Sequence, residues 1–145
     1  MRRKQRDSSL IHRTTTQVRF SEVDMMGIAW HGNYVKYLED GREDFGRHFG
    51  GIGYMDIYRS GFKAPIVELY IDYKIAVTVG ECITVETRYI NCEAAKIMFD
   101  YTLYNEAGDT VLTASTTQVF LDENNCLSLV NPPFYLDWKA RWNVN

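Results

Sequence analysis

The sequence is poor in the residues that cross-link or rigidify small proteins. Its 145 residues include only 3 cysteines and 3 prolines. The cysteines, Cys82, Cys92 and Cys126, form no CxxC pair, and an odd number of thiols favours a reducing, cytoplasmic compartment over a disulfide framework. No apolar run approaches the ~18 residues of a membrane span, so we expect a soluble protein with no membrane partner.

Metal-binding patterns and basic charge are also scarce. The three histidines, His12, His31 and His48, lack zinc-ligand spacing, so we expect no metal and no cofactor besides a substrate's own groups. Positions 14–145 carry 11 basic and 18 acidic residues, so the body of the chain lacks the basic excess that binds nucleic acid. Five further basic residues lie in positions 1–13, where no apolar segment follows as in a signal peptide, and we interpret this stretch as a flexible tail.

The composition is that of one globular domain. Hydrophobic residues make up 46% and charged residues 24% of the chain, close to the average for folded proteins. A chain of this length buries roughly 68–70% of the surface that its unfolded form exposes, so a core can form without disulfides. We find no repeat or linker and predict a single domain over residues 1–145.

Residues 33–49 are predicted to form the one long helix. Their apolar side chains recur at helical spacing on one stripe, at Tyr34, Leu38, Phe45 and Phe49. Gly41 lies on the same stripe and costs about 1 kcal/mol relative to alanine, which indicates a close approach of another part of the backbone. Glycines at 50–53 end the helix, and residues 54–60 are predicted to form a short helical turn.

Alternating side chains predict five strands, at positions 14–20, 67–75, 83–89, 97–103 and 110–122. Short turns indicate that consecutive strands pair antiparallel, and paired prolines open a terminal helix at 132–142. An α+β domain follows, in which the sheet curls around the long helix and buries its stripe. Four outward positions are too apolar for a solvated face and predict a homodimer or homotetramer: Ile66, Tyr70, Met98 and Tyr104.

The segment from Phe20 to Tyr34, continued by Tyr37 to Glu43, resembles a known family signature. It is similar to that of the 4-hydroxybenzoyl-CoA thioesterase-like branch of the hotdog superfamily, which includes the YbgC-type acyl-CoA thioesterases. The matching positions are Asp24, Gly27, His31, Asn33, Tyr34, Glu39 and Arg42. The resemblance covers about residues 14–122. It implies a hotdog fold and a hydrolase that cleaves an acyl-CoA to the free acid and coenzyme A.

The residues themselves agree with that chemistry. A carboxylate just before a helix is suited to attack a carbonyl held at the helix N-terminus, or to activate water against it. Asp24 is in that position, and the first N–H groups of the helix point outward as an oxyanion hole. In the family, one donor is the N–H at the position of His31, and Gly32 removes a Cβ that would crowd the acyl group. We also expect Asn33, Tyr34 and Lys96 at the substrate.

Each of these residues has an alternative role. Asp24 could only stabilise its turn, because short acidic side chains favour turns. His31 could hydrogen-bond locally or polarise the thioester. Asp40 stands nine residues after His31, as the catalytic acid of another hotdog branch does, and is the alternative catalytic residue. Tyr34, Tyr37 and Arg42 are typical of core packing and ion pairing.

The substrate is less well defined by the sequence. Family members that bind coenzyme A often carry a basic cluster before the fourth strand, where only Lys96 matches, so an acyl carrier protein could deliver the acyl group instead. A binding protein without turnover is the second hypothesis, because Met25, Met26 and Trp30 could fill the pocket. A dehydratase would depend on Asp40 alone. The acyl chain is expected in a tunnel at the subunit interface, with candidate lining residues Tyr54, Met55, Tyr58 and Phe62.

Overall fold

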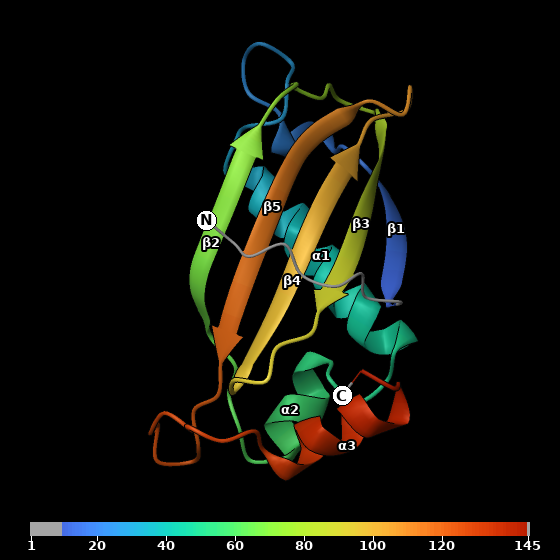
Figure 1. The fold of residues 1–145 in the computed structure, drawn as a ribbon. Coiled ribbons are helices and arrows are strands. Elements are labelled where there is room, and N and C mark those ends of the chain that lie inside the picture. The colour runs from blue at the N-terminus through green and yellow to red at the C-terminus, as the bar shows by residue number, and fades with distance from the viewer. Residues whose placement is uncertain (1–9, 145) are drawn as a thin grey trace.

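Residues 10–144 are described by a computed structural model, and their five strands form one antiparallel sheet in the order β1-β3-β4-β5-β2 (Figure 1). The strands are β1 (Ile11–Gln17), β2 (Ile66–Tyr73), β3 (Cys82–Ile90), β4 (Lys96–Tyr104) and β5 (Thr110–Val119). Side chains alternate between buried and partly exposed along β3 and β4, as the period of two predicts. The sheet therefore has one apolar face, which must be buried against another element.

Helix α1 (Asn33–His48) is that element and lies across the sheet (Figure 1). Its buried stripe includes Tyr37, Leu38 and Phe45, each at most 2% exposed. Gly41 lies in close contact with β3 as predicted, but the contact is with side chains and not with another part of the backbone. A Cβ on this residue would lie 2.6 Å from Val85 Cγ1, so only glycine lets the helix rest on β3 at this distance. The hotdog architecture predicted from the sequence is confirmed.

Two shorter helices close one end of the sheet, near the C-terminal end of α1 (Figure 1). These are α2 (Tyr54–Arg59) and α3 (Pro133–Arg141), both close to their predicted positions. The indole N–H of Trp138 in α3 donates to the Phe49 carbonyl at 2.8 Å. This bond fixes α3 to the segment where α1 ends.

Two features of the sheet differ from the predictions. β2 pairs with β5 and not with the consecutive strand β3, because β1 already occupies the free side of β3 along its whole length. β1 also begins earlier than predicted, so residues 11–13 belong to the sheet and not to the predicted tail. Residues 1–9 of that tail lie outside the described residues.

The edge strand β2 is unusually exposed for an apolar strand. Val67 is 60% exposed, Leu69 42% and Tyr70 64%. Isolated exposed apolar residues are common, but a contiguous row on an unpaired edge marks an interaction surface. Across residues 10–144, no helix has the length and apolar character needed to cross a membrane.

Candidate active site

The chain between the short 3-10 helix η1 (Phe20–Glu22) and α1 forms a loop that presents Asp24. A β-bridge closes the loop at its base, and a second one, between Ile28 and Thr78, fastens it to the connection from β2 to β3. Asp24 is exposed, and its Oδ1 accepts a 2.8 Å hydrogen bond from the Met26 N–H. The carboxylate thus stabilises its own turn while its side chain remains accessible.

Two backbone N–H groups just before α1 have no hydrogen-bond partner among residues 10–144. They belong to His31 and Gly32, and Gly32 already has helical geometry, with φ −68° and ψ −21°. The next two are used, since Asn33 N donates to Trp30 O at 2.9 Å and Tyr34 N to His31 O at 3.4 Å. Unpaired N–H groups at the positive end of a helix favour an anionic oxygen.

Trp30 limits the space beside these amides. A Cβ on Gly32 would overlap with the Trp30 indole, so the glycine makes room for this ring. The sequence had suggested room for an acyl group instead. The indole also lies 4.9 Å from the imidazole of His31, centroid to centroid. The exposed His31 side chain is therefore packed against an aromatic face.

Asn33 is buried and holds the start of α1 to η1. Its Nδ2 donates to the carbonyl of Glu22 at 2.8 Å. The Glu22 side chain accepts a 3.0 Å hydrogen bond from the Tyr37 hydroxyl. Sequence reasoning missed Glu22, because a lone acid ahead of the motif gives no signal for these long-range contacts.

Two tyrosines brace the other side of the helix start. The Tyr34 hydroxyl accepts a 3.3 Å hydrogen bond from the Val77 N–H, and the Tyr73 hydroxyl donates to the His31 carbonyl at 3.0 Å. Burial raises the pKa of Tyr34 and of Tyr37 above the usual 10.0, although the Val77 hydrogen bond opposes the shift at Tyr34. Both hydroxyls are therefore neutral at physiological pH and serve as fixed hydrogen-bonding groups.

Lys96 and Asp40 lie away from Asp24 within one chain. Lys96 begins β4, after a turn whose Cys92 carbonyl accepts a 3.0 Å hydrogen bond from Lys139 of α3. That end of the molecule is separated from the Asp24 loop by α1, whose 16 residues span about 24 Å. Asp40 is exposed on α1 between the two ends.

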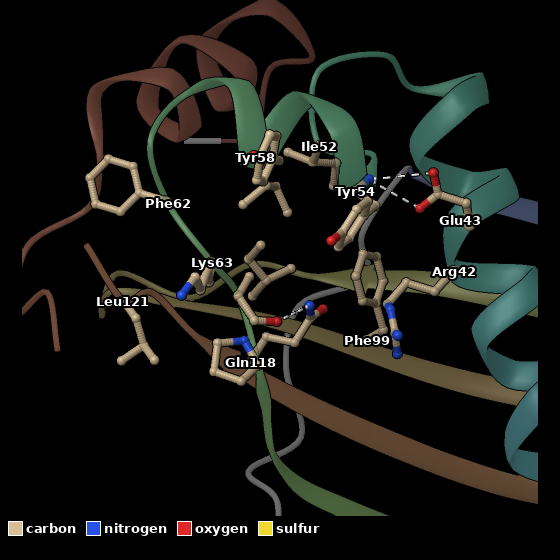
Figure 2. Close-up of a pocket in the computed structure, with 14 residues that line it drawn as sticks. Arg42, Glu43, Ile52, Tyr54, Tyr58, Phe62, Lys63, Phe99, Gln118 and Leu121 are labelled. Atoms are coloured by element: carbon tan, nitrogen blue, oxygen red, sulfur yellow. Dashed lines mark hydrogen bonds between the residues drawn. The ribbon is translucent and has the colours of Figure 1, made fainter. Parts of the chain in front are cut away.

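A cavity of about 400 Å³ lies at the end of α1 remote from Asp24, between α1, α2 and the sheet (Figure 2). Its wall is largely apolar and includes Tyr54, Tyr58 and Phe62, three of the four residues expected around an acyl group. The fourth, Met55, does not line it. The size and apolar wall suit a small ligand with few polar groups.

The fold and site together define a class of protein. An antiparallel sheet wrapped around one helix is the hotdog fold, and the chain leading into that helix carries both an exposed carboxylate and two unpaired amides, groups that can serve acyl transfer. The sequence matches the thioesterase-like superfamily over residues 18–138. The chain belongs to this superfamily, which confirms the family expected from the sequence.

Individual relatives agree with this assignment. The Bacillus subtilis protein YneP, named as a candidate acyl-CoA thioesterase, is 29% identical over 126 residues, which cover 87% of this chain and 91% of YneP. The chloroplast acyl-acyl carrier protein thioesterase ATL3 of Arabidopsis thaliana is 29% identical over 79% of this chain and 60% of its own length. A crystal structure of DHNA-CoA thioesterase from Staphylococcus aureus superposes with a TM-score of 0.82 at 24% identity, over 92% of this chain and 91% of that one.

Proposed function

We propose that the protein is an acyl-CoA thioesterase in which Asp24 is the catalytic carboxylate. The observation that carries the proposal is the pair of unpaired N–H groups of His31 and Gly32 at the start of α1, on the loop that also bears Asp24. Such donors stabilise the negative charge that develops on a carbonyl oxygen during acyl transfer. Membership of the thioesterase-like superfamily supports the same reaction.

In the proposed reaction, the thioester oxygen accepts hydrogen bonds from the two amides. The Asp24 carboxylate then either attacks the carbonyl carbon, forming an anhydride that water hydrolyses to the free acid after the thiolate has left, or removes a proton from a water molecule that attacks the carbon directly. The carbon–sulfur bond breaks and the sulfur leaves as a thiolate, which needs little acid assistance because thiols have a pKa near ~8.5. The reaction uses no cofactor beyond the coenzyme A of the substrate.

We further propose that the working unit is a homodimer, paired through β2. A two-fold axis through the middle of this strand would place its Tyr73 end beside the Ile66 end of the copy. The Tyr73 end adjoins the catalytic loop through the hydrogen bond to His31, and Ala64, just before the Ile66 end, lines the cavity. Each Asp24 would then face the cavity of the other subunit, which would hold the acyl group.

In this dimer, Lys96 could also contribute to substrate binding. It lies at the cavity end of the chain, so in the dimer it would approach the Asp24 loop of the other subunit and could meet a phosphate of coenzyme A. A single cation makes a weak nucleotide site, and the similarity to ATL3 supports an acyl carrier protein as the alternative donor. The three free cysteines support a reducing, cytoplasmic location.

The test compares wild type, Asp24→Asn and Asp40→Asn on a panel of aliphatic and aromatic acyl-CoAs, with the same acyl groups on a carrier protein. We expect Asp24→Asn to lower kcat by about 10² to 10⁴, the usual contribution of a catalytic acid or base. Asp40→Asn removes the rival carboxylate and should remain within about twofold of wild type. Equal rates for wild type and Asp24→Asn would remove Asp24 from the mechanism. Binding of thioesters without hydrolysis by wild type would identify a binding protein instead.

A further inference from the structure

We propose that the cavity selects acyl groups that carry an oxygen acceptor at the end remote from the thioester, and that Arg42 binds this oxygen. The acceptor is a hydroxyl, oxo or carboxylate oxygen. This inference rests on the proposed thioesterase function and specifies its substrate class. It makes Arg42 a specificity-determining residue, although the sequence indicated core packing and ion pairing.

Among the charged and amide side chains on the cavity wall, all but one have a hydrogen-bond partner within residues 10–144. Lys63 Nζ donates to Asn125 Oδ1 at 2.8 Å, and Gln118 Nε2 donates to the Ala64 carbonyl at 2.7 Å. The Glu43 carboxylate accepts hydrogen bonds of 3.1 and 3.3 Å from the Tyr54 N–H. Each of these groups therefore already has a partner within the chain.

Arg42 is the exception. Its side chain lines the cavity, and no residue among 10–144 forms a hydrogen bond or ion pair with it. Nη1 is shielded from solvent and unpartnered, so a ligand in the cavity would reach the guanidinium through its other nitrogens, which are not shielded in this way. In Figure 2, Arg42 leaves α1 over the sheet, and its nitrogen atoms lie away from the Glu43 carboxylate, which is turned toward Tyr54.

A guanidinium in this position discriminates between ligands. It is charged at any physiological pH and presents only donors, so it must find an acceptor or remain unpaired. A plain hydrocarbon in the cavity would displace water from the accessible nitrogens of Arg42 without replacing the lost hydrogen bonds, which is costly for a charged group. An acyl group with an oxygen at the right depth would satisfy the guanidinium while its hydrocarbon part contacts the apolar wall.

The burial pattern indicates which end of the acyl group carries the oxygen. Lys63 is exposed at the surface, whereas the Arg42 side chain is only partly exposed. The two lie on opposite sides of the cavity in Figure 2, and we place the thioester on the Lys63 side. The reacting thioester has to remain outside, where a coenzyme or carrier can reach it, so the oxygen near Arg42 is remote from the bond that is cleaved.

The test measures kcat/KM for three substrates of equal chain length: octanoyl-CoA, 8-hydroxyoctanoyl-CoA and the mono-CoA thioester of octanedioic acid. We expect wild type to favour one or both oxygenated substrates. In Arg42→Met, the ratio of the favoured oxygenated substrate to octanoyl-CoA should fall by roughly 10- to 100-fold, mainly through KM, as expected for loss of a charge-assisted hydrogen bond. Arg47→Met removes the same charge from an exposed position of the same helix and should leave the ratio unchanged. If Arg42→Met does not fold, Arg42→Gln replaces it in the test. In that variant, the preference for the octanedioic acid thioester over octanoyl-CoA should fall more than the preference for 8-hydroxyoctanoyl-CoA.

An unchanged ratio in the Arg42 variant would overturn the proposal. So would a loss of dimer with an unchanged ratio, because Arg42 would then pair with a second copy of the chain. Calorimetry of wild type and Arg42→Met with octanoate and octanedioate requires no turnover. Wild type should bind octanedioate more tightly than octanoate, and Arg42→Met should lose this difference. If no thioester is hydrolysed, the thioesterase function fails while calorimetry still decides the role of Arg42.

Discussion

Complementation between two inactive variants tests whether each active site is shared between subunits. Asp24→Asn removes the catalytic carboxylate and leaves the cavity open. Ala64→Trp fills the cavity from its wall and leaves Asp24 in place. If Asp24 acts on an acyl group held by the other subunit, a heterodimer of the two variants contains one site with both parts intact and one site with neither.

The expected size of the effect follows from counting sites. Random reassociation of an equal mixture makes half of the dimers heterodimers, and half of their sites are competent, so the mixture should recover about a quarter of wild-type activity. If each subunit instead used its own Asp24 and its own cavity, every site in every dimer would lack one part. The mixture would then remain as inactive as its components.

The assay mixes the two variants under mild denaturation, restores native buffer, and follows release of coenzyme A with a thiol reagent. Size-exclusion chromatography of each variant and of the mixture confirms that dimers form. Recovery near one quarter supports sharing of the site. Absence of recovery in a mixture that contains heterodimers would refute both the shared site and the pairing through β2.

Two further predictions concern stability. Gly41→Ala should lower the free energy of unfolding in urea by roughly 1 kcal/mol, because a Cβ 2.6 Å from Val85 Cγ1 overpacks the core at a cost larger than the gain in helix propensity. The control is Gly50→Ala, whose Cβ would meet no atom within 4 Å and whose free energy of unfolding should stay within about 0.5 kcal/mol of wild type. Equal losses in the two variants would contradict the packing argument. At Asp44, desolvation raises the pKa, but hydrogen bonds from Thr14 and His12 outweigh it and leave the pKa below its usual 3.8. The contribution of the ionised Asp44 carboxylate to stability is therefore complete above about pH 4 and is lost as the pH falls. The urea midpoints of wild type and Asp44→Asn should differ at pH 7 and converge toward pH 3. A difference that stays constant with pH would exclude the ionised carboxylate as its source.

Periodicity was sufficient for the elements of this fold. The stripe of α1 and the alternation of β3 and β4 come from side chains close in sequence, and a glycine within the stripe indicated a close contact, which the structure shows to be with the Val85 side chain. The pairing of β2 could not be obtained in this way. In the structure β1 pairs with the side of β3 that β4 leaves free, and β2 lies beside β5, a long-range arrangement that alternation within one strand does not report.

The same distinction applies to the site. Asp24 and His31 lie seven residues apart, so one motif contains both the carboxylate and a candidate oxyanion donor. The cavity joins α1, α2, the segment before β2 and residues of β4 and β5, and no local pattern reports on such a set. Arg42 illustrates the limit, since its sequence position suggested core packing and an ion pair, and no residue among 10–144 pairs with its guanidinium.

The separation of the two functional ends along α1 has a consequence for specificity. The Asp24 loop and the start of α1 are held by contacts of Glu22, Val77 and Tyr73, none of which lines the cavity. The cavity depends on α2 and on Arg42 from the other half of the helix. Substitutions in the cavity that change which acyl group is accepted therefore need not disturb the Asp24 loop, where the thioester is proposed to react. In the proposed dimer the two halves meet only across subunits, so one unchanged catalytic loop can serve cavities of different depth and polarity.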